Sequence, residues 1–148
     1  MKIYVFGTRG FPNIQGGVEK HCEELYTSMS DTYEITVFRR KPFVKSNTTY
    51  KKIHFIDLST VKTKGLEALL HSFLCVLYCI IKRPDITHVH NIGPGLFIPL
   101  LKMVGLKVVL TYHSPNYEHS KWSYLAKKGL KICEFIATKG ADKIIFVN

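Results

Sequence analysis

A glycine-rich stretch, GTRGFPNIQGG, follows the first apolar run of the chain and precedes an amphipathic segment. Gly16 and Gly17 stand directly before that segment, so their backbone N–H groups and the positive end of a helix dipole would suit a phosphate. Arg9 and Asn13 lie in the same stretch, and Arg9 could fork onto a phosphate or a carboxylate. The opposite interpretation, that the glycines only permit turns, explains the stretch equally well. The spacing matches neither GxGxxG nor GxxxxGKS/T, which argues against a dinucleotide or P-loop site.

Histidines lie at the ends of two later apolar runs. One run, DITHVHN, ends with His90 and Asn91, and the other, VVLTYHS, carries His113 near its end. The two-residue period of a strand places His88 and His90 on one face, where either could be a core residue with satisfied nitrogens. His113 is the better candidate for chemistry, because a polar loop begins there and its ring could bind a sugar hydroxyl or a phosphate, or exchange a proton. The sequence shows no GxSxG motif and no complete catalytic set.

One spacing raises the question of a metal. His71, Cys75 and Cys79 recur every four residues and would share one face of a helix, as metal ligands can. Their neighbours are leucine, phenylalanine, valine and isoleucine, so we expect them to be buried in the core and to bind no metal. The four cysteines form no CxxC pair, which is typical of small buried side chains in a reducing compartment.

A parallel sheet would bring these residues together. Apolar runs rich in β-branched residues alternate with segments of helical period, which is typical of βαβ units. We expect strands at residues 2–7, 33–39, 51–58, 85–91, 106–113 and 142–148, and helices at about 17–29, 66–81, 95–103 and 122–139. The predicted fold class is α/β: a single Rossmann-like, three-layer αβα domain over residues 1–148 with a parallel sheet of about six strands. The carboxyl ends of parallel strands share one edge, where ligands bind.

Charge and hydropathy bear on the partner. The 148 residues include 21 Lys and Arg against 11 Asp and Glu, and the formal net charge of +10 favours an anionic partner. Nucleic acid is the weakest choice, since no recognition helix or basic-aromatic RNA motif is present. The segment 66–81 is shorter than the roughly 20 apolar residues of a spanning helix; a helix covering the sheet is favoured, and a membrane-facing helix is the alternative. The start of the chain has no signal peptide, so we expect a cytoplasmic protein.

Several segments together resemble the N-terminal domain of a GT-B glycosyltransferase, specifically the retaining family 4 group and its rhamnosyltransferase-like branch. The resemblance is carried by GTRGFPNIQGGVEKHCEEL, RPDITHVHN, KVVLTYHS and GADKIIFVN, which span the chain from end to end. It implies that Gly16 and Gly17 touch the donor diphosphate, that the catalytic His113 lies beside the transferred sugar, and that Arg9 and Asn91 border the acceptor. The implied reaction needs no metal and no cofactor, only the nucleotide-sugar donor.

The resemblance also implies a role for the whole enzyme. Such an enzyme would move rhamnose or a similar hexose to a lipid-linked or polysaccharide acceptor in surface polysaccharide biosynthesis, with peripheral contact to the anionic inner membrane face. The family usually continues into a second Rossmann-like domain that holds the nucleotide sugar. We therefore expect residues 1–148 to be the acceptor-side half of a GT-B fold, inactive alone. The alternative is a free-standing flavodoxin-like module that binds a small anionic ligand without catalysis.

Overall fold

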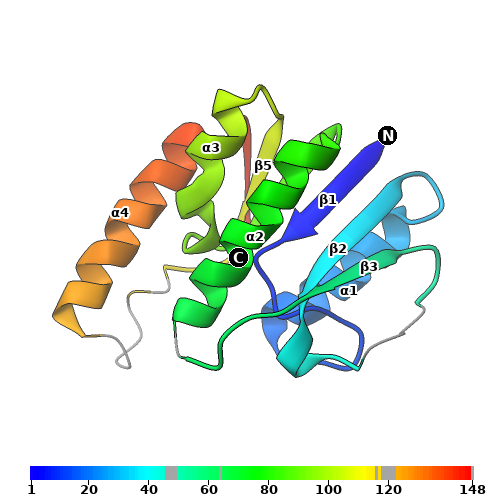
Figure 1. Cartoon of the computed structure of the whole chain (residues 1–148), viewed down its shortest axis with the longest axis horizontal. Coiled ribbons are helices and arrows are strands. Elements are labelled where there is room, and N and C mark those ends of the chain that lie inside the picture. Colours follow the sequence, from blue (N-terminus) through cyan, green and yellow to red (C-terminus); the bar gives the residue numbers. More distant parts are fainter. Residues whose placement is uncertain (46–49, 64, 116, 118–122, 148) are drawn as a thin grey trace.

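The computed structural model describes residues 1–45, 50–63, 65–115, 117 and 123–147, over which strands and helices alternate (Figure 1). The strands are β1 (Lys2–Phe6), β2 (Glu34–Arg40), β3 (His54–Leu58), β4 (Ile86–His90), β5 (Val108–Tyr112) and β6 (Lys143–Phe146). The helices are α1 (Gly17–Met29), α2 (Leu66–Lys82), α3 (Ile98–Met103) and α4 (Tyr124–Gly140), with 3-10 turns η1 (Lys41–Phe43) and η2 (Pro94–Phe97).

All strands of the described residues form one parallel sheet in the order β3-β2-β1-β4-β5-β6. This topology confirms the predicted α/β fold. The chain moves outward from β1 to β3 on one side and then from β4 to β6 on the other, so the order reverses between β1 and β4. A crevice forms at such a reversal, beyond the carboxyl ends of the two strands. The glycine-rich stretch leaves β1 at that edge.

Two apolar clusters hold the three layers together. On one face, Cys22 and Tyr26 of α1 pack against Val5 and Val37 of the sheet. On the other face, residues of α2, α3 and α4 pack against Phe6, Phe38, Val89, Val108 and Leu110. Figure 1 shows α2 in front of the sheet and α1 behind β2 and β3. Each cluster buries large side chains completely, which provides the apolar burial that drives folding.

Each expected element is present, with one helix divided and several ends shifted; β3, for example, begins at His54 and not at residue 51. The helix expected at 95–103 is divided into η2 and α3, and Pro99, which lacks an N–H donor, lies in the first turn of α3. α4 begins after Ser123, whose hydroxyl accepts a hydrogen bond from the Ala126 N–H. The expected ends at Trp122 and Asn148 lie outside the described residues.

The helix α2 covers the sheet, as favoured from the sequence, and leaves a second apolar face outward. Cys75, Val76 and Cys79 are buried against the sheet. The outward face exposes a row of large apolar side chains: Leu66, Leu70, Phe73, Leu77 and Ile81. Among the helices of the described ranges, none has the length and apolar character needed to cross a membrane.

Candidate functional site

The stretch between β1 and α1 is held close to the sheet edge by two glycines with positive φ. Gly7 has φ 108°, and a Cβ there would overlap the backbone carbonyl of His90. Gly16 has φ 152°, and a Cβ there would overlap the Glu19 carboxylate and the Arg9 guanidinium. Only glycine fits both the conformation and the close approach at these positions. The interpretation that these glycines permit turns is thus supported at both positions.

Gly17 is different, because a Cβ at this position would meet no atom within 4 Å. It is the first residue of α1, so its N–H belongs to the end of the helix that carries partial positive charge. The two neighbouring glycines therefore differ in their surroundings. Gly16 shapes the loop, whereas Gly17 borders open space at the helix N-terminus.

Arg9, expected to meet an acceptor, closes the loop through Glu19 of α1. Its Nε lies 3.1 Å from Oε1 of Glu19, its backbone N–H donates to the same oxygen at 3.2 Å, and its Nη2 donates to the carbonyl of Gln15 at 2.8 Å. Burial opposes ionisation of Glu19, but these hydrogen bonds outweigh burial and lower the pKa of Glu19. The Arg9 side chain is 37% exposed, so it can still contact a ligand while it is paired.

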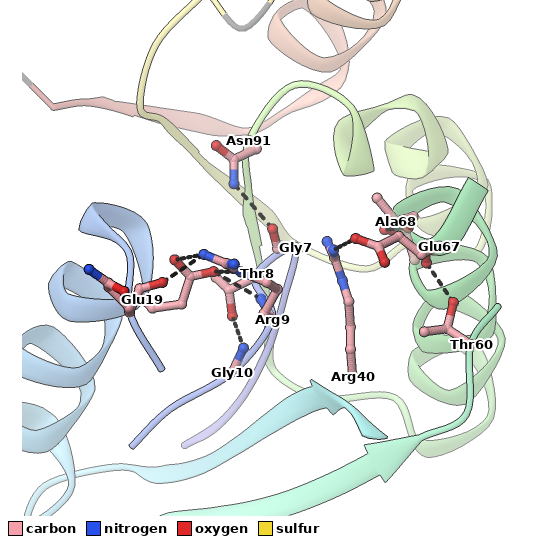
Figure 2. A network of polar contacts seen from close by, with 12 residues as sticks. Gly7, Thr8, Arg9, Gly10, Glu19, Arg40, Thr60, Glu67, Ala68 and Asn91 are labelled. Atoms are coloured by element: carbon pink, nitrogen blue, oxygen red, sulfur yellow. Dashed lines mark hydrogen bonds and ion pairs between the residues drawn. The ribbon is translucent and has the colours of Figure 1, made fainter. Parts of the chain in front are cut away.

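A second ion pair lies across the loop from the first. Nη1 of Arg40, at the end of β2, donates to Oε1 of Glu67 in α2 at 3.1 Å. Burial lowers the pKa of Arg40, and its Nε is buried with no hydrogen-bond partner among the described residues. Figure 2 shows the Arg9–Glu19 pair and the Arg40–Glu67 pair on either side of Gly7.

Both ion pairs line a cavity of about 760 Å³ at the carboxyl edge of the sheet. Asn91 lines it as well, held by a hydrogen bond from its Nδ2 to the carbonyl of Gly7 at 3.1 Å and by a left-handed backbone with φ 71°. Apolar residues form the opposite walls: Leu69 of α2, Leu96 of η2, and Leu130, Ile132 and Cys133 of α4. The cavity thus combines charged and apolar lining residues, a combination suited to an amphiphilic ligand.

His113 lies at the same edge but is not among the residues that line this cavity. It is half-buried, and its Nε2 lies 2.9 Å from Nδ1 of His90 in stacked rings. The ring of His21, on α1, meets it edge-on with centroids 5.1 Å apart. Burial, with a smaller contribution from His21, lowers the pKa of His113 to about 4, so its imidazole is neutral at pH 7.

The sheet edge also contains a buried ion pair that the sequence did not reveal. Arg39 of β2 is 2% exposed and binds Asp57 of β3 through two hydrogen bonds, at 2.7 and 2.8 Å. The same guanidinium donates to the carbonyl of Phe11 at 3.3 Å and lies over the ring of Phe55. Gly10 packs against the stem of Arg39. Arg39 therefore holds the glycine-rich stretch against the end of β2 through its contacts with Gly10 and Phe11.

The cysteine and histidine residues of α2 are packed in the core. His71, Cys75 and Cys79 are all fully buried, which confirms the packing interpretation, and Sγ of Cys75 lies 3.6 Å from Nδ1 of His71. Burial lowers the pKa of His71 to about 4. In the described part of the chain, no three His, Cys, Asp or Glu side chains are grouped so that they could hold a metal ion.

Comparison with known proteins agrees with this architecture. A family model described as Glycosyltransferase Family 4 matches residues 15–148. The solved structure of UGT89C1 from Arabidopsis thaliana, complexed with UDP, superposes with a TM-score of 0.55 at 10% sequence identity. The match covers 99% of this chain and 42% of that protein, so the likeness concerns the fold of one part of it. No curated protein matches the sequence. The family match extends over most of the chain, including Gly16, Gly17 and every strand after the first, and the chain belongs to glycosyltransferase family 4.

Proposed function

We propose that this chain forms the acceptor-side, N-terminal half of a retaining, metal-independent glycosyltransferase whose second Rossmann-like domain binds the nucleotide sugar. The observation that carries the proposal is the position of Gly17, which borders open space at the N-terminus of α1 on the same sheet edge as His113 and the cavity. Backbone N–H groups at a helix N-terminus stabilise phosphate without a metal. Gly17 and its neighbour Gly16 would meet the donor diphosphate there.

The acceptor would enter the cavity. Arg9 and Asn91 line it and offer guanidinium and amide donors to the acceptor hydroxyls. The apolar walls from α2 and α4 suit the hydrocarbon part of a lipid-linked acceptor. His113 would lie beside the transferred sugar, where a neutral imidazole can hydrogen-bond a hydroxyl. We propose rhamnose or a similar hexose as that sugar, and surface polysaccharide biosynthesis as the setting.

A lipid-linked acceptor requires contact with a membrane. The outward face of α2, with Leu70, Phe73 and Leu77, is flanked by Lys62 and Lys82, a combination typical of interfacial helices. Each lysine or arginine near an anionic bilayer contributes about 1 kcal/mol to binding. The proposal therefore places a cytoplasmic protein on the inner membrane face, held by peripheral contact.

The experiment expresses the complete reading frame that contains these residues and measures sugar transfer and donor hydrolysis with a panel of UDP-, dTDP- and GDP-sugars. We expect activity with one donor and a loss of at least about 100-fold in His113→Ala, the scale of a positioned catalytic group. His54→Ala is the matched control, because His54 is exposed on β3 away from the site. Activity that is unchanged in His113→Ala would remove His113 from the reaction. An inert complete protein that binds a small anion would instead favour the flavodoxin-like module.

A further inference from the structure

Beneath His113, a single chain of hydrogen bonds crosses the interior between the sheet and α1. Nε2 of His113 lies 2.9 Å from Nδ1 of His90, and Nε2 of His90 lies 2.6 Å from the hydroxyl of Tyr26. The same hydroxyl lies 2.8 Å from Nδ1 of His88, whose Nε2 lies 2.7 Å from Oγ1 of Thr111. The other four residues, His90, Tyr26, His88 and Thr111, are buried, so their hydrogen bonds are shielded from solvent.

We call this series of hydrogen-bonded residues the histidine chain; its members are His113, His90, Tyr26, His88 and Thr111. Its three imidazoles are neutral at pH 7. Burial lowers the pKa of His88 and of His113 to about 4 and that of His90 further still. A neutral imidazole has one N–H, so it donates through one ring nitrogen and accepts through the other.

Because each ring, like the Tyr26 hydroxyl, has a single proton to donate, the direction of one hydrogen bond in the chain determines the direction of the next. If His113 donates from Nε2, His90 must accept at Nδ1 and donate from Nε2, Tyr26 must donate to His88, and His88 must donate from Nε2 to Thr111. All three histidines are then Nε2–H tautomers. With every bond reversed, all three are Nδ1–H tautomers. Different tautomers at His88 and His90 would present the Tyr26 hydroxyl with two donors or two acceptors, and different tautomers at His90 and His113 would set two N–H groups or two lone pairs against each other. Each mismatch leaves a buried polar group without a hydrogen bond, which is costly.

We propose that Tyr26 and His90 are positioning residues that hold the neutral imidazole of His113 in one tautomer, matched to that of His88. The consequence for the site is at Nδ1 of His113, the ring nitrogen outside the chain. It is an acceptor for a sugar hydroxyl when all three tautomers are Nε2–H, and a donor when all are Nδ1–H. The role at the sugar rests on the proposed function, whereas the coupling of the tautomers does not.

The titratable groups that face His113 act on its charge and do not break the coupling. His21 on α1 disfavours the imidazolium, and Glu19 on the same helix favours it. Burial outweighs Glu19, so the neutral form prevails near pH 7. Cys22, whose Sγ lies 3.6 Å from Nδ1 of His90, stays a thiol because burial raises its pKa.

The test is long-range ¹H–¹⁵N NMR of the ¹⁵N-labelled 148-residue chain at pH 7, which distinguishes protonated from unprotonated ring nitrogens. We expect His88, His90 and His113 to share one tautomer, all Nε2–H or all Nδ1–H. Different tautomers among the three in the wild-type chain would overturn the proposal. This measurement needs no variant, no substrate and no second domain.

Two variants test whether the coupling passes through the chain. In Tyr26→Phe, the link between His88 and His90 is cut, and we expect the signals of His113 to become those of a tautomer mixture. Tyr50→Phe is the matched control, because it removes a hydroxyl bonded to Glu23, outside the histidine chain. In Thr111→Val, Nε2 of His88 loses the acceptor that an Nε2–H needs and equally the donor that an unprotonated Nε2 needs, so whichever tautomer His88 adopts should be shared by His90 and by His113 at the far end. An unchanged His113 signal in Tyr26→Phe, or different tautomers at His88 and His113 in Thr111→Val, would contradict the proposal.

Activity separates this inference from the proposed function. In the complete enzyme, Tyr26→Phe should lower kcat by about 10-fold with little change in the KM of the donor, since Tyr26 is fully buried and acts only through the histidines. If His113→Ala leaves transfer intact while the NMR result holds, the tautomer coupling stands and the role of His113 at the sugar is wrong. If the tautomers are uncoupled while His113→Ala is inactive, the role of His113 in transfer stands and the tautomer coupling is wrong.

Discussion

His113 and His90 are joined across the ends of two neighbouring strands, with Nε2 of one 2.9 Å from Nδ1 of the other. The strand register produces this contact, because Thr111 of β5 pairs with His90 of β4 and His113 follows two residues later at the carboxyl edge. A side chain held by a buried neighbour loses little conformational entropy when a ligand binds. The candidate catalytic group thus lies directly after β5, at the start of the loop, and is held to the sheet by its contact with His90.

The two glycines before and at the start of α1 should respond differently to substitution. Gly17→Ala adds a methyl group in open space and replaces glycine at a helical position, so we expect unchanged or slightly higher stability. Gly16→Ala forces a Cβ into the Glu19–Arg9 pair at positive φ, and we expect a loss of about 1 to 3 kcal/mol. Thermal unfolding of both variants measures the difference.

The same pair of variants tests phosphate binding. If Gly17→Ala folds normally, as expected, a loss of transfer in the complete enzyme would report on the space beside the helix N-terminus. Equal destabilisation of the two variants would contradict the distinction between a glycine that shapes the loop and one that faces the donor.

Glu19→Gln should destabilise the protein at neutral pH and much less in acid. The folded-state pKa of Glu19 lies below the unfolded value near 4.5, so its ionised form contributes stability above that pH. This contribution is lost as the pH falls through the folded-state pKa. A hydrogen-bonded charge of this kind contributes about 1.5 to 3 kcal/mol. We expect the gap between wild type and variant to narrow as the pH falls below the unfolded-state pKa and to close below the folded-state pKa of Glu19.

Urea unfolding at a series of pH values measures that gap. Glu24→Gln is the control, because Glu24 forms an exposed i,i+4 pair with Lys20 on the same helix. Such a pair contributes only about 0.3 to 0.5 kcal/mol. A pH-independent gap for Glu19→Gln would show that the carboxylate charge does not hold the loop.

Local sequence pattern was enough to predict the layers and the edge that carries the site. Helix α1 begins and ends at the expected residues, and each expected strand is present, because the periods of strands and helices are visible within short windows. The edge followed from parallel strands alone, which is why Asn91 could be placed there, beside Gly7.

The contacts within the site could not be predicted in this way. Tyr26 meets His88 and His90 across more than 60 residues of sequence, and Arg39 meets Asp57 in the neighbouring strand. Such contacts depend on register and on which helix covers which face, neither of which is encoded in a local period. Of the site contacts, the position of Glu19 at the start of α1 is the one that a local pattern could have indicated. Glu19 lies three residues after Gly16, where an acidic residue stabilises the N-terminus of a helix.

The buried Arg39–Asp57 pair should be one of the largest single contributors to the stability of this edge. Asp57→Asn leaves the Arg39 guanidinium buried without its counter-charge, and we expect a loss of about 3 to 5 kcal/mol in the free energy of unfolding. Asp31→Asn serves as control, because its pair with Lys52 is fully exposed and screened by solvent, so its loss should change stability little. Denaturant unfolding of the two variants gives the comparison, and similar losses in both would contradict the assignment.

The outward face of α2 should bind anionic membranes if the proposed acceptor is lipid-linked. Phe73→Ser together with Leu77→Ser removes two partly exposed apolar side chains of the outward row, of which Phe73 contacts the ring of Phe97, so the fold should persist while vesicle binding weakens by about 10-fold or more. Sedimentation with phosphatidylglycerol vesicles measures the binding, and neutral phosphatidylcholine vesicles show the part due to charge. Met103→Ser, exposed at the end of α3, is the matched control for loss of a surface apolar side chain.

Since the apolar row and its flanking lysines act together, high salt should reduce binding of the wild type as well. Equal binding by wild type and the α2 variant would mean that basic charge alone attracts the protein, and that α2 does not enter the membrane.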